Sequence, residues 1–291
     1  MIVDSDAGTD PDDTLVAILV AKHRALFGAT LLVSNDETTS FAKGRFLRHL
    51  VGDDLAVAAG LPSDRKRDRD NASDAGLVPE VFVTRDAVEQ IERELEQHET
   101  VEYVGLGALT NLAAVLARRP ELASRVRLTQ MGPAIAGNFK RERAQYNARV
   151  DPAAFRAVLR AVPTPTLVCT HTTWGAIPPP LGVYPGDEIA MAAPEIYRRH
   201  LDAFVASGKD CSILHDPTTL LVTREPQLVD FIEVDVVIDE QGWLHLTRAA
   251  REAIDCPLIT TTATREDDPI RVRLSLGADY PRIRRRVLEL L

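Results

Sequence analysis

Five aspartates lie within ten positions near the start of the chain, in the segment VDSDAGTDPDD: Asp4, Asp6, Asp10, Asp12 and Asp13. Carboxylates this close repel one another, which raises their pKa values unless another charge compensates. One interpretation is that they cap a helix and fill a turn, but this explains one or two of them and not five. A hard divalent cation, Ca²⁺ or Mg²⁺, accounts for the rest, because such ions take carboxylate and carbonyl oxygens as ligands. The cluster therefore favours a metal site.

Three further segments carry residue types that suit a binding site. His215 and Asp216 stand just before an apolar helix in ILHDPTTLL, although Asp216 also suits the N-cap position ahead of a proline at N1. Glycines in VGLGALTNLAAVL flank a strand end, where a backbone carbonyl can reach a ligand. The segment AGNFKRERAQYNARVDPAA offers Asn138, Gln145 and Asn147 as hydrogen-bonding partners for hydroxyls, with a turn residue as the alternative for any asparagine.

The elements that must position these groups alternate along the chain. Short apolar segments predict strands at Ile2–Asp4, Thr30–Val33, Leu55–Ala58, Val101–Gly105, Val126–Met131 and Thr166–Thr170, and antiparallel strands between residues 231 and 276. Apolar periodicity predicts helices at Thr14–His23, Thr39–Val51, Asp86–His98, Pro152–Arg160, Glu188–Ser207 and Pro281–Leu290, and others that open at Thr110, as N-cap, and at the HDP segment. The polar residues 61–80 predict a long surface loop, in which the charge run Arg65–Asp70 faces solvent. This alternation predicts one α/β domain over residues 1–291, with an open, mostly parallel sheet and helices on both faces.

Composition narrows the class of function. The net charge of −9 argues against a nucleic-acid partner, whose phosphates repel an acidic protein. Three cysteines without a CxxC pair argue against a disulfide framework and a zinc site. We find no apolar run of about 20 residues and no basic, apolar leader, so we expect a cytoplasmic protein without a membrane partner.

Taken in order, the motifs resemble one family. The nucleoside hydrolases of the inosine–uridine-preferring type open with an Asp-x-Asp-x-Gly…Asp-Asp motif, matched here by DSDAGTDPDD. The stretch GALTNLA, the loop MGPAIAGN, the segment QYNARVDPAA and the pair in HDP match the family's later motifs in the same order. The resemblance covers nearly the whole chain and implies hydrolysis of the N-glycosidic bond of ribonucleosides with a bound Ca²⁺.

The resemblance also implies roles in metal binding and catalysis. Asp6 would bind Ca²⁺ and act as the general base towards water. Asp13, Asp216 and the main-chain carbonyl of Leu106 would be further Ca²⁺ ligands. His215 would sit near the leaving base, where it could donate a proton. The metal's identity as Ca²⁺ rather than Mg²⁺ follows from the resemblance and the oxygen-only ligand set.

A second group of residues would bind the sugar. The resemblance assigns the ribose 2′- and 3′-hydroxyls to Asp12, Asn35, Asn147 and Asp216. It assigns the 5′-hydroxyl to Asn138. Relatives of this type are commonly dimers or tetramers, so the resemblance also implies a homo-oligomer.

Three departures from the family pattern affect these expectations. Two extra residues precede the pair Asp12-Asp13, so that Asp10 could take one of the roles. Gln145 stands where the family usually has a glutamate; it can still bind a hydroxyl but lacks the negative charge. The segment NASDAGL replaces a familiar His-Gly segment of the active-site rim. Two alternatives stay open: a riboside-binding member without catalysis, and a phosphatase of the haloacid-dehalogenase type, whose Asp-x-Asp motif is superficially similar.

Overall fold

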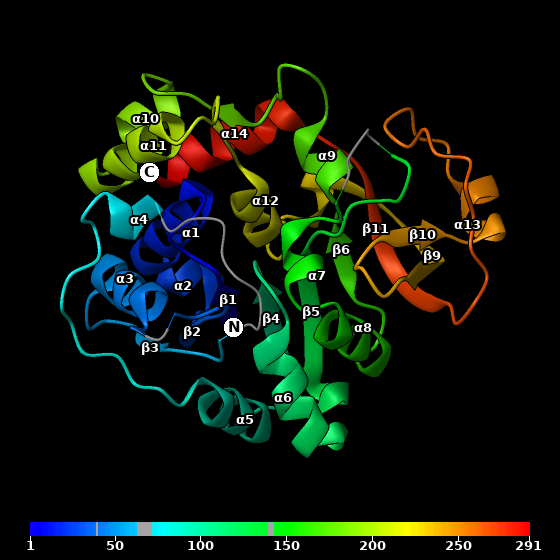
Figure 1. Ribbon diagram of the computed structural model, residues 1–291, viewed down its shortest axis with the longest axis horizontal. Coiled ribbons are helices and arrows are strands. Elements are labelled where there is room, and N and C mark those ends of the chain that lie inside the picture. Colours follow the sequence, from blue (N-terminus) through cyan, green and yellow to red (C-terminus); the bar gives the residue numbers. More distant parts are fainter. Residues whose placement is uncertain (39, 63–70, 139–142) are drawn as a thin grey trace.

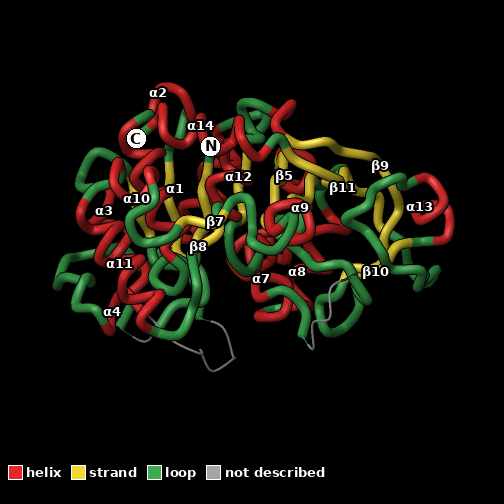
Figure 2. The backbone as a smooth tube through the Cα atoms, turned by 90° about the horizontal axis from the view of Figure 1, so that it is seen from above, coloured by secondary structure: helices red, strands yellow, loops and turns green. Residues whose placement is uncertain are grey.

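The computed structural model describes residues 1–38, 40–62, 71–138 and 143–291. Within them, nine strands form one sheet in the order β10-β9-β11-β6-β5-β4-β1-β2-β3 (Figure 1), and β7 pairs with β8 in a small second sheet (Figure 2). The strands are Ile2–Ser5 (β1), Leu31–Ser34 (β2), Ala56–Ala58 (β3), Val101–Gly105 (β4), Val126–Met131 (β5), Thr166–Val168 (β6), Gly182–Val183 (β7), Ser212–Ile213 (β8), Val229–Ile238 (β9), Leu244–Leu246 (β10) and Ile270–Ala278 (β11).

The large sheet is mostly parallel. From β3 through β1 and β6 to β11, each strand runs parallel to its neighbour. Only the edge formed by β9 and β10 is antiparallel in the described residues. The chain builds β1, β2 and β3 outward in one direction and then returns to place β4 on the other side of β1. In such sheets ligands bind beside the carboxyl ends of the strands where the order reverses, which here is the β1–β4 boundary.

Helices pack on both faces of the sheet, and Figure 2 shows them around the strands. They are Pro11–Lys22 (α1), Arg24–Phe27 (α2), Ala42–Val51 (α3), Asn71–Asp74 (α4), Ala87–Gln97 (α5), Thr110–Arg118 (α6), Tyr146–Val150 (α7), Pro152–Ala161 (α8), Thr170–Trp174 (α9), Glu188–Ala192 (α10), Glu195–Ala206 (α11), His215–Leu221 (α12), Arg248–Ala253 (α13) and Tyr280–Leu290 (α14), with 3₁₀ turns at Pro120–Arg125 and Pro226–Leu228. Among the helices of the described chain, none is long and apolar enough to cross a bilayer.

Two buried apolar clusters explain why both faces are covered. Successive side chains of a strand point to opposite faces. Accordingly Val3 belongs to a cluster with α1, α3, α11 and α14, whereas its neighbour Ile2 belongs to a cluster with α5, α6 and α8. Leu32 and Leu31 of β2 divide in the same way. The predicted fold class, an open and mostly parallel sheet between helical layers, is confirmed.

Several predicted boundaries move for local reasons. The first helix begins at Pro11 instead of Thr14, because Asp10 is its N-cap. The predicted helix Glu188–Ser207 is two helices, since Pro194 has no amide hydrogen to continue the first one. The strand predicted to end at Thr170 ends at Val168, and Thr170 opens α9.

Two other local predictions are wrong. Thr110 is the first residue of α6 and not its N-cap; its hydroxyl donates a 2.9 Å hydrogen bond to Asp151. The predicted loop 61–80 contains the short helix α4, while the charge run Arg65–Asp70 lies outside the described residues.

Candidate active site

A cavity of about 530 Å³ lies at the carboxyl ends of the central strands. Asp6 follows β1, Leu106 follows β4, and Met131 ends β5; all three line the cavity. Helices α1, α7 and α12 contribute Asp12, Asp13, Asn147, His215 and Asp216, and α9 contributes Thr170 and Trp174. The cavity therefore occupies the β1–β4 boundary that the strand order marks as a binding position.

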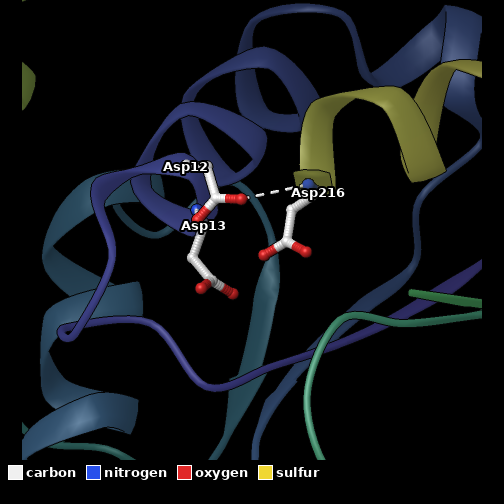
Figure 3. A group of neighbouring side chains, drawn as sticks. All are labelled: Asp12, Asp13 and Asp216. Carbon is white, nitrogen blue, oxygen red and sulfur yellow. Dashed lines mark hydrogen bonds between the residues drawn. The ribbon is translucent and has the colours of Figure 1, made fainter. Parts of the chain in front are cut away.

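Three carboxylates converge in this cavity. Asp12 and Asp13 lie in the first turn of α1, and Asp216 lies in the first turn of α12. One carboxylate oxygen from each lies within 4.8 Å of the others, and Figure 3 shows the three side chains arranged around a common space. The main-chain nitrogens of Asp216 and Asp13 each donate a 3.1 Å hydrogen bond to the carboxylate of Asp12. Two helix N-termini thus bring the trio together.

The trio is electrostatically costly without a cation. All three side chains are buried, and burial raises their pKa values well above the ordinary 3.8. The neighbouring carboxylates raise them further: Asp10 and Asp13 act on Asp12, and Asp6 acts on Asp13. The positive ends of the helix dipoles offset part of this repulsion. Buried carboxylate oxygens in this arrangement fit a hard divalent cation in their donor chemistry and their charge.

Of the carboxylates in the predicted ligand set, Asp13 and Asp216 belong to the trio, whose third member is Asp12 and not Asp6. Asp12, predicted to bind the ribose, belongs to the trio. Asp6, predicted as a ligand, lines the cavity beside it, and its carboxylate lies 3.9 Å from the ammonium of Lys43. Ser5 also contributes, because its hydroxyl donates a 2.5 Å hydrogen bond to Asp13. In the sequence, the only feature that could have pointed to Ser5 is its position between Asp4 and Asp6.

Helix α7 forms another wall of the cavity. Gln145 is its N-cap, with Oε1 accepting a 3.3 Å hydrogen bond from the amide of Ala148. Asn147 donates a 2.5 Å hydrogen bond to the carbonyl of Leu106, the carbonyl predicted to bind the metal. Gln145, Asn147 and Leu106 all line the cavity, as the resemblance led us to expect.

His215 lies on the wall formed by α12 and α9. Its Nδ1 is 2.5 Å from the hydroxyl oxygen of Thr173, and its ring centroid is 6.5 Å from that of Trp174, with the planes tilted by 33°. The rings of His215 and Trp174 both border the cavity. Since α12 begins at His215 with Leu214 as N-cap, Asp216 is not the helix cap that its sequence context also allowed.

Asn35 is buried and is not among the described residues that line the cavity. Its Nδ2 donates a 2.9 Å hydrogen bond to Asp4, and its Oδ1 accepts a 3.2 Å bond from the amide of Ala108. Asp4 also accepts hydrogen bonds from Tyr103 and Asn111 in the sheet interior. Burial raises the pKa of Asp4 to about 7. Both ends of its amide thus join β1, β2 and the loop after β4, and its assignment to a ribose hydroxyl stays a prediction.

Asn138, which the resemblance assigns to the 5′-hydroxyl, is likewise held by hydrogen bonds within the chain, and its assignment stays a prediction. Its Nδ2 donates a 2.9 Å hydrogen bond to the carbonyl of Leu258, and its Oδ1 accepts from both the amide and the hydroxyl of Thr260. The side chain is buried, and the described residues that line the cavity do not include it. Asn138 joins the loop after β5 to the segment before β11.

Asp10 and Asp4, like Asp6, do not belong to the trio. Asp10 caps α1 and accepts a 2.5 Å hydrogen bond from the hydroxyl of Ser212. Burial raises its pKa to about 6. The capping interpretation is therefore right for Asp10, and the sheet interior accounts for Asp4.

Asn71 borders the cavity from α4, and sequence reasoning did not single it out. Its Nδ2 donates a 2.8 Å hydrogen bond to the carbonyl of Thr9. It belongs to NASDAGL, the segment that replaces the familiar rim motif. The replacement of the family's His-Gly segment by NASDAGL was therefore the one sequence feature that pointed to these residues.

The comparisons with known proteins agree with this geometry. The model of the family "Inosine-uridine preferring nucleoside hydrolase" matches residues 1–282. The pyrimidine-specific ribonucleoside hydrolase RihA of Klebsiella pneumoniae (strain 342) is 29% identical over 264 residues, which are 83% of this chain and 85% of that protein. The protein of the same name from Photobacterium profundum is 28% identical over 286 residues, 90% of this chain and 92% of its own.

Solved structures show the same fold. A plant nucleoside hydrolase, PpNRh1, matches with a TM-score of 0.79 at 18% identity, covering 99% of this chain and 97% of its own. An inosine-uridine preferring nucleoside hydrolase from Bacillus anthracis matches with a TM-score of 0.70 at 15% identity and the same coverage of 99% and 97%. The family match rules out the haloacid-dehalogenase alternative. The chain belongs to the inosine-uridine preferring nucleoside hydrolase family.

Proposed function

We propose that this protein hydrolyses the N-glycosidic bond of a ribonucleoside or related N-riboside, giving free base and ribose, with Ca²⁺ as cofactor. The observation that carries the proposal is the convergence of Asp12, Asp13 and Asp216 in a cavity that Asp6 and His215 also line. Family membership supports the reaction class. The curated relatives named above are described as pyrimidine-specific, so uridine and cytidine are the first substrates to try.

The carboxylates of Asp12, Asp13 and Asp216 would hold Ca²⁺, with Asp6 and the carbonyl of Leu106 as further oxygen donors. Bound there, Ca²⁺ would compensate the clustered negative charge and lower the pKa of water. We also propose that these oxygens bind the sugar. The ribose hydroxyls are hydrogen-bond donors, and carboxylate oxygens are suitable acceptors for them.

Each residue around the cavity has a separate role in breaking the N-glycosidic bond in this proposal. Asp6 accepts the proton of the water that attacks C1′ of the ribose. Positive charge develops on the sugar as the bond to the base breaks, as in other glycoside hydrolyses. The carboxylates around the cavity favour that charge, and Asn147 fixes a sugar hydroxyl. On the other side His215 donates a proton to the departing base, and Trp174 offers it an aromatic face.

The test is release of base and ribose from a panel of ribonucleosides, including uridine, cytidine and inosine. We expect wild-type protein to hydrolyse at least one of them, to lose activity with a chelator and to regain it with Ca²⁺. The variant Asp6→Ala should lose activity, whereas Asp53→Ala, at an exposed position, should keep it. If wild-type protein releases no base but calorimetry still shows riboside binding, the non-catalytic alternative replaces the proposal.

A further inference from the structure

Lys43 is a buried cation that no sequence motif marks. It lies in the first turn of α3, and the residue is only 1% exposed. Its ammonium donates a 2.8 Å hydrogen bond to the main-chain carbonyl of Asp6 and lies 3.9 Å from the carboxylate of the same residue. One lysine therefore contacts both the backbone and the side chain of the proposed general base.

The same ammonium reaches a second acidic residue. It lies 3.7 Å from a carboxylate oxygen of Asp36, which follows β2. That oxygen of Asp36 accepts a 2.8 Å hydrogen bond from the hydroxyl of Tyr146, which borders the cavity from α7. Lys43 thus links the loop after β1 with the end of β2 and, through Asp36 and Tyr146, with the wall that carries Asn147.

The position of Asp6 makes this contact significant. Asp6 follows the end of β1 and precedes Gly8, whose φ of 116° belongs to a turn. A residue in such a turn lacks the backbone ladder that fixes a strand, so its orientation depends on side-chain contacts. A fully buried ammonium is costly unless it is paired and hydrogen-bonded. Its contacts with Asp6 and Asp36 meet that requirement and at the same time restrain Asp6.

We propose that Lys43 is a positioning residue for catalysis: it orients Asp6, through the backbone carbonyl and the carboxylate, for proton transfer from water. This inference rests on the proposed function, in which Asp6 is the general base. Among the described residues, the hydrogen bond and the ion pairs of the Lys43 ammonium go to Asp6 and Asp36 and not to the carboxylates of the trio. Lys43 therefore acts on the proton-transfer step rather than on metal or sugar binding.

The experiment compares three variants of the full chain with wild type. Lys43→Met keeps the length of the side chain and removes the charge. Lys43→Met combined with Asp36→Asn also removes the acidic partner, so that no carboxylate at position 36 is left without its cation. Lys22→Met is the matched control, because the ammonium of Lys22 contacts the carbonyl of Leu291 at the C-terminus. Each protein is assayed for kcat, KM, thermal unfolding and calorimetric Ca²⁺ binding.

A misplaced catalytic group costs about 100-fold in rate, so we expect kcat of Lys43→Met to fall by about that factor. KM should stay within about twofold, and Ca²⁺ should bind as tightly as to wild type or more tightly, since a positive charge near the site is gone. The double variant should recover thermal stability but not kcat, and Lys22→Met should match wild type throughout.

Three results in an active wild-type background would overturn the inference alone. The first is full kcat in Lys43→Met. The second is joint recovery of kcat and stability in the double variant, and the third is joint loss of kcat and Ca²⁺ affinity in Lys43→Met; either of these assigns Lys43 a purely structural role. A wild-type protein that hydrolyses no riboside would instead overturn the proposed function and this inference together.

Discussion

The main-chain nitrogen of Asp216 donates a 3.1 Å hydrogen bond to the carboxylate of Asp12, across 204 positions of sequence. The bond joins the N-terminal turns of α12 and α1, so the two helices present their first-turn carboxylates to the same space. Backbone amides donate to both oxygens of Asp12, and the hydroxyl of Ser5 donates to Asp13. Figure 3 shows the three carboxylates close together. Repulsion between these carboxylates destabilises the metal-free protein. A bound cation would attract all three carboxylates and so stabilise the same arrangement.

The variant Asp216→Asn should therefore change stability in opposite directions with and without Ca²⁺. In chelator it removes one of three mutually repelling carboxylates, so we expect the free energy of unfolding to rise by about 1 kcal/mol, the equivalent of a pKa change of about one unit. With saturating Ca²⁺ the wild type should be the more stable protein, because the variant has lost a ligand. Urea unfolding under both conditions checks the reversal, and an unchanged order of stabilities would contradict the metal site.

Calcium affinity should increase with pH. Burial raises the pKa of Asp10 to about 6, and it raises the pKa values of Asp12, Asp13 and Asp216 well above 3.8. Between about pH 4 and these raised values the folded metal-free protein binds protons that the unfolded chain has lost, so its stability falls as pH rises. Ca²⁺ must displace those protons. Calorimetry at about pH 6 in two buffers of different ionisation enthalpy should detect proton release, which should shrink as the pH is raised further; pH-independent affinity would count against the site.

Thr173 should matter for the leaving base. Its hydroxyl lies 2.5 Å from Nδ1 of His215, so it fixes the ring that we propose as proton donor. Thr173→Val should lower kcat by about tenfold or more for nucleosides whose base leaves as a protonated group. It should have little effect on a riboside with a leaving group that needs no proton, such as p-nitrophenolate.

The neighbouring Thr172 provides the matched control for this experiment. Its hydroxyl is also buried and hydrogen-bonded, but its partner is Ser275 rather than His215. Thr172→Val should leave the ratio of the two rates unchanged. Equal loss of both rates in Thr173→Val would show that Thr173 supports the structure and not proton donation.

The sheet could be predicted from the sequence because its signals are local. The strands Val101–Gly105 and Val126–Met131 match the predicted bounds, since each is a short apolar run with clear flanks. The predicted boundaries were wrong where one residue beside the element decided where it begins or ends. Examples are Asp10, which caps α1, and Pro194, which separates α10 from α11. These effects depend on side chains next to the element rather than on its periodicity.

The site was predictable only in part. Asp12, Asp13 and Asp216 meet through tertiary structure, so residue types and spacing alone indicate a metal but not its ligands. The role of Asn35 could not be decided from its residue type, because an amide can hydrogen-bond within the protein core, as it does here, or bind a sugar hydroxyl. Lys43 was overlooked because a lysine in a predicted helix usually faces solvent.

Gln145 provides a test of the charge that surrounds the sugar. It lines the cavity, and its Oε1 caps α7 by accepting the hydrogen bond from the amide of Ala148. A glutamate can make the same capping bond and interacts more favourably with the positive end of the helix dipole, so Gln145→Glu should fold normally. The added negative charge should favour the positive charge that develops on the ribose.

We therefore expect Gln145→Glu to raise kcat by severalfold with little change in KM, because the interaction strengthens only as the bond to the base breaks. Gln145→Met is the partner variant: it removes the hydrogen-bonding group and should lower kcat and destabilise α7 by about 1 kcal/mol through the lost cap. Steady-state kinetics on the best ribonucleoside, with Ca²⁺ saturating, measure both. A Gln145→Glu protein that is slower than wild type would mean that the neutral amide suits this enzyme's own substrate, and that the sugar's charge is stabilised by the aspartates alone.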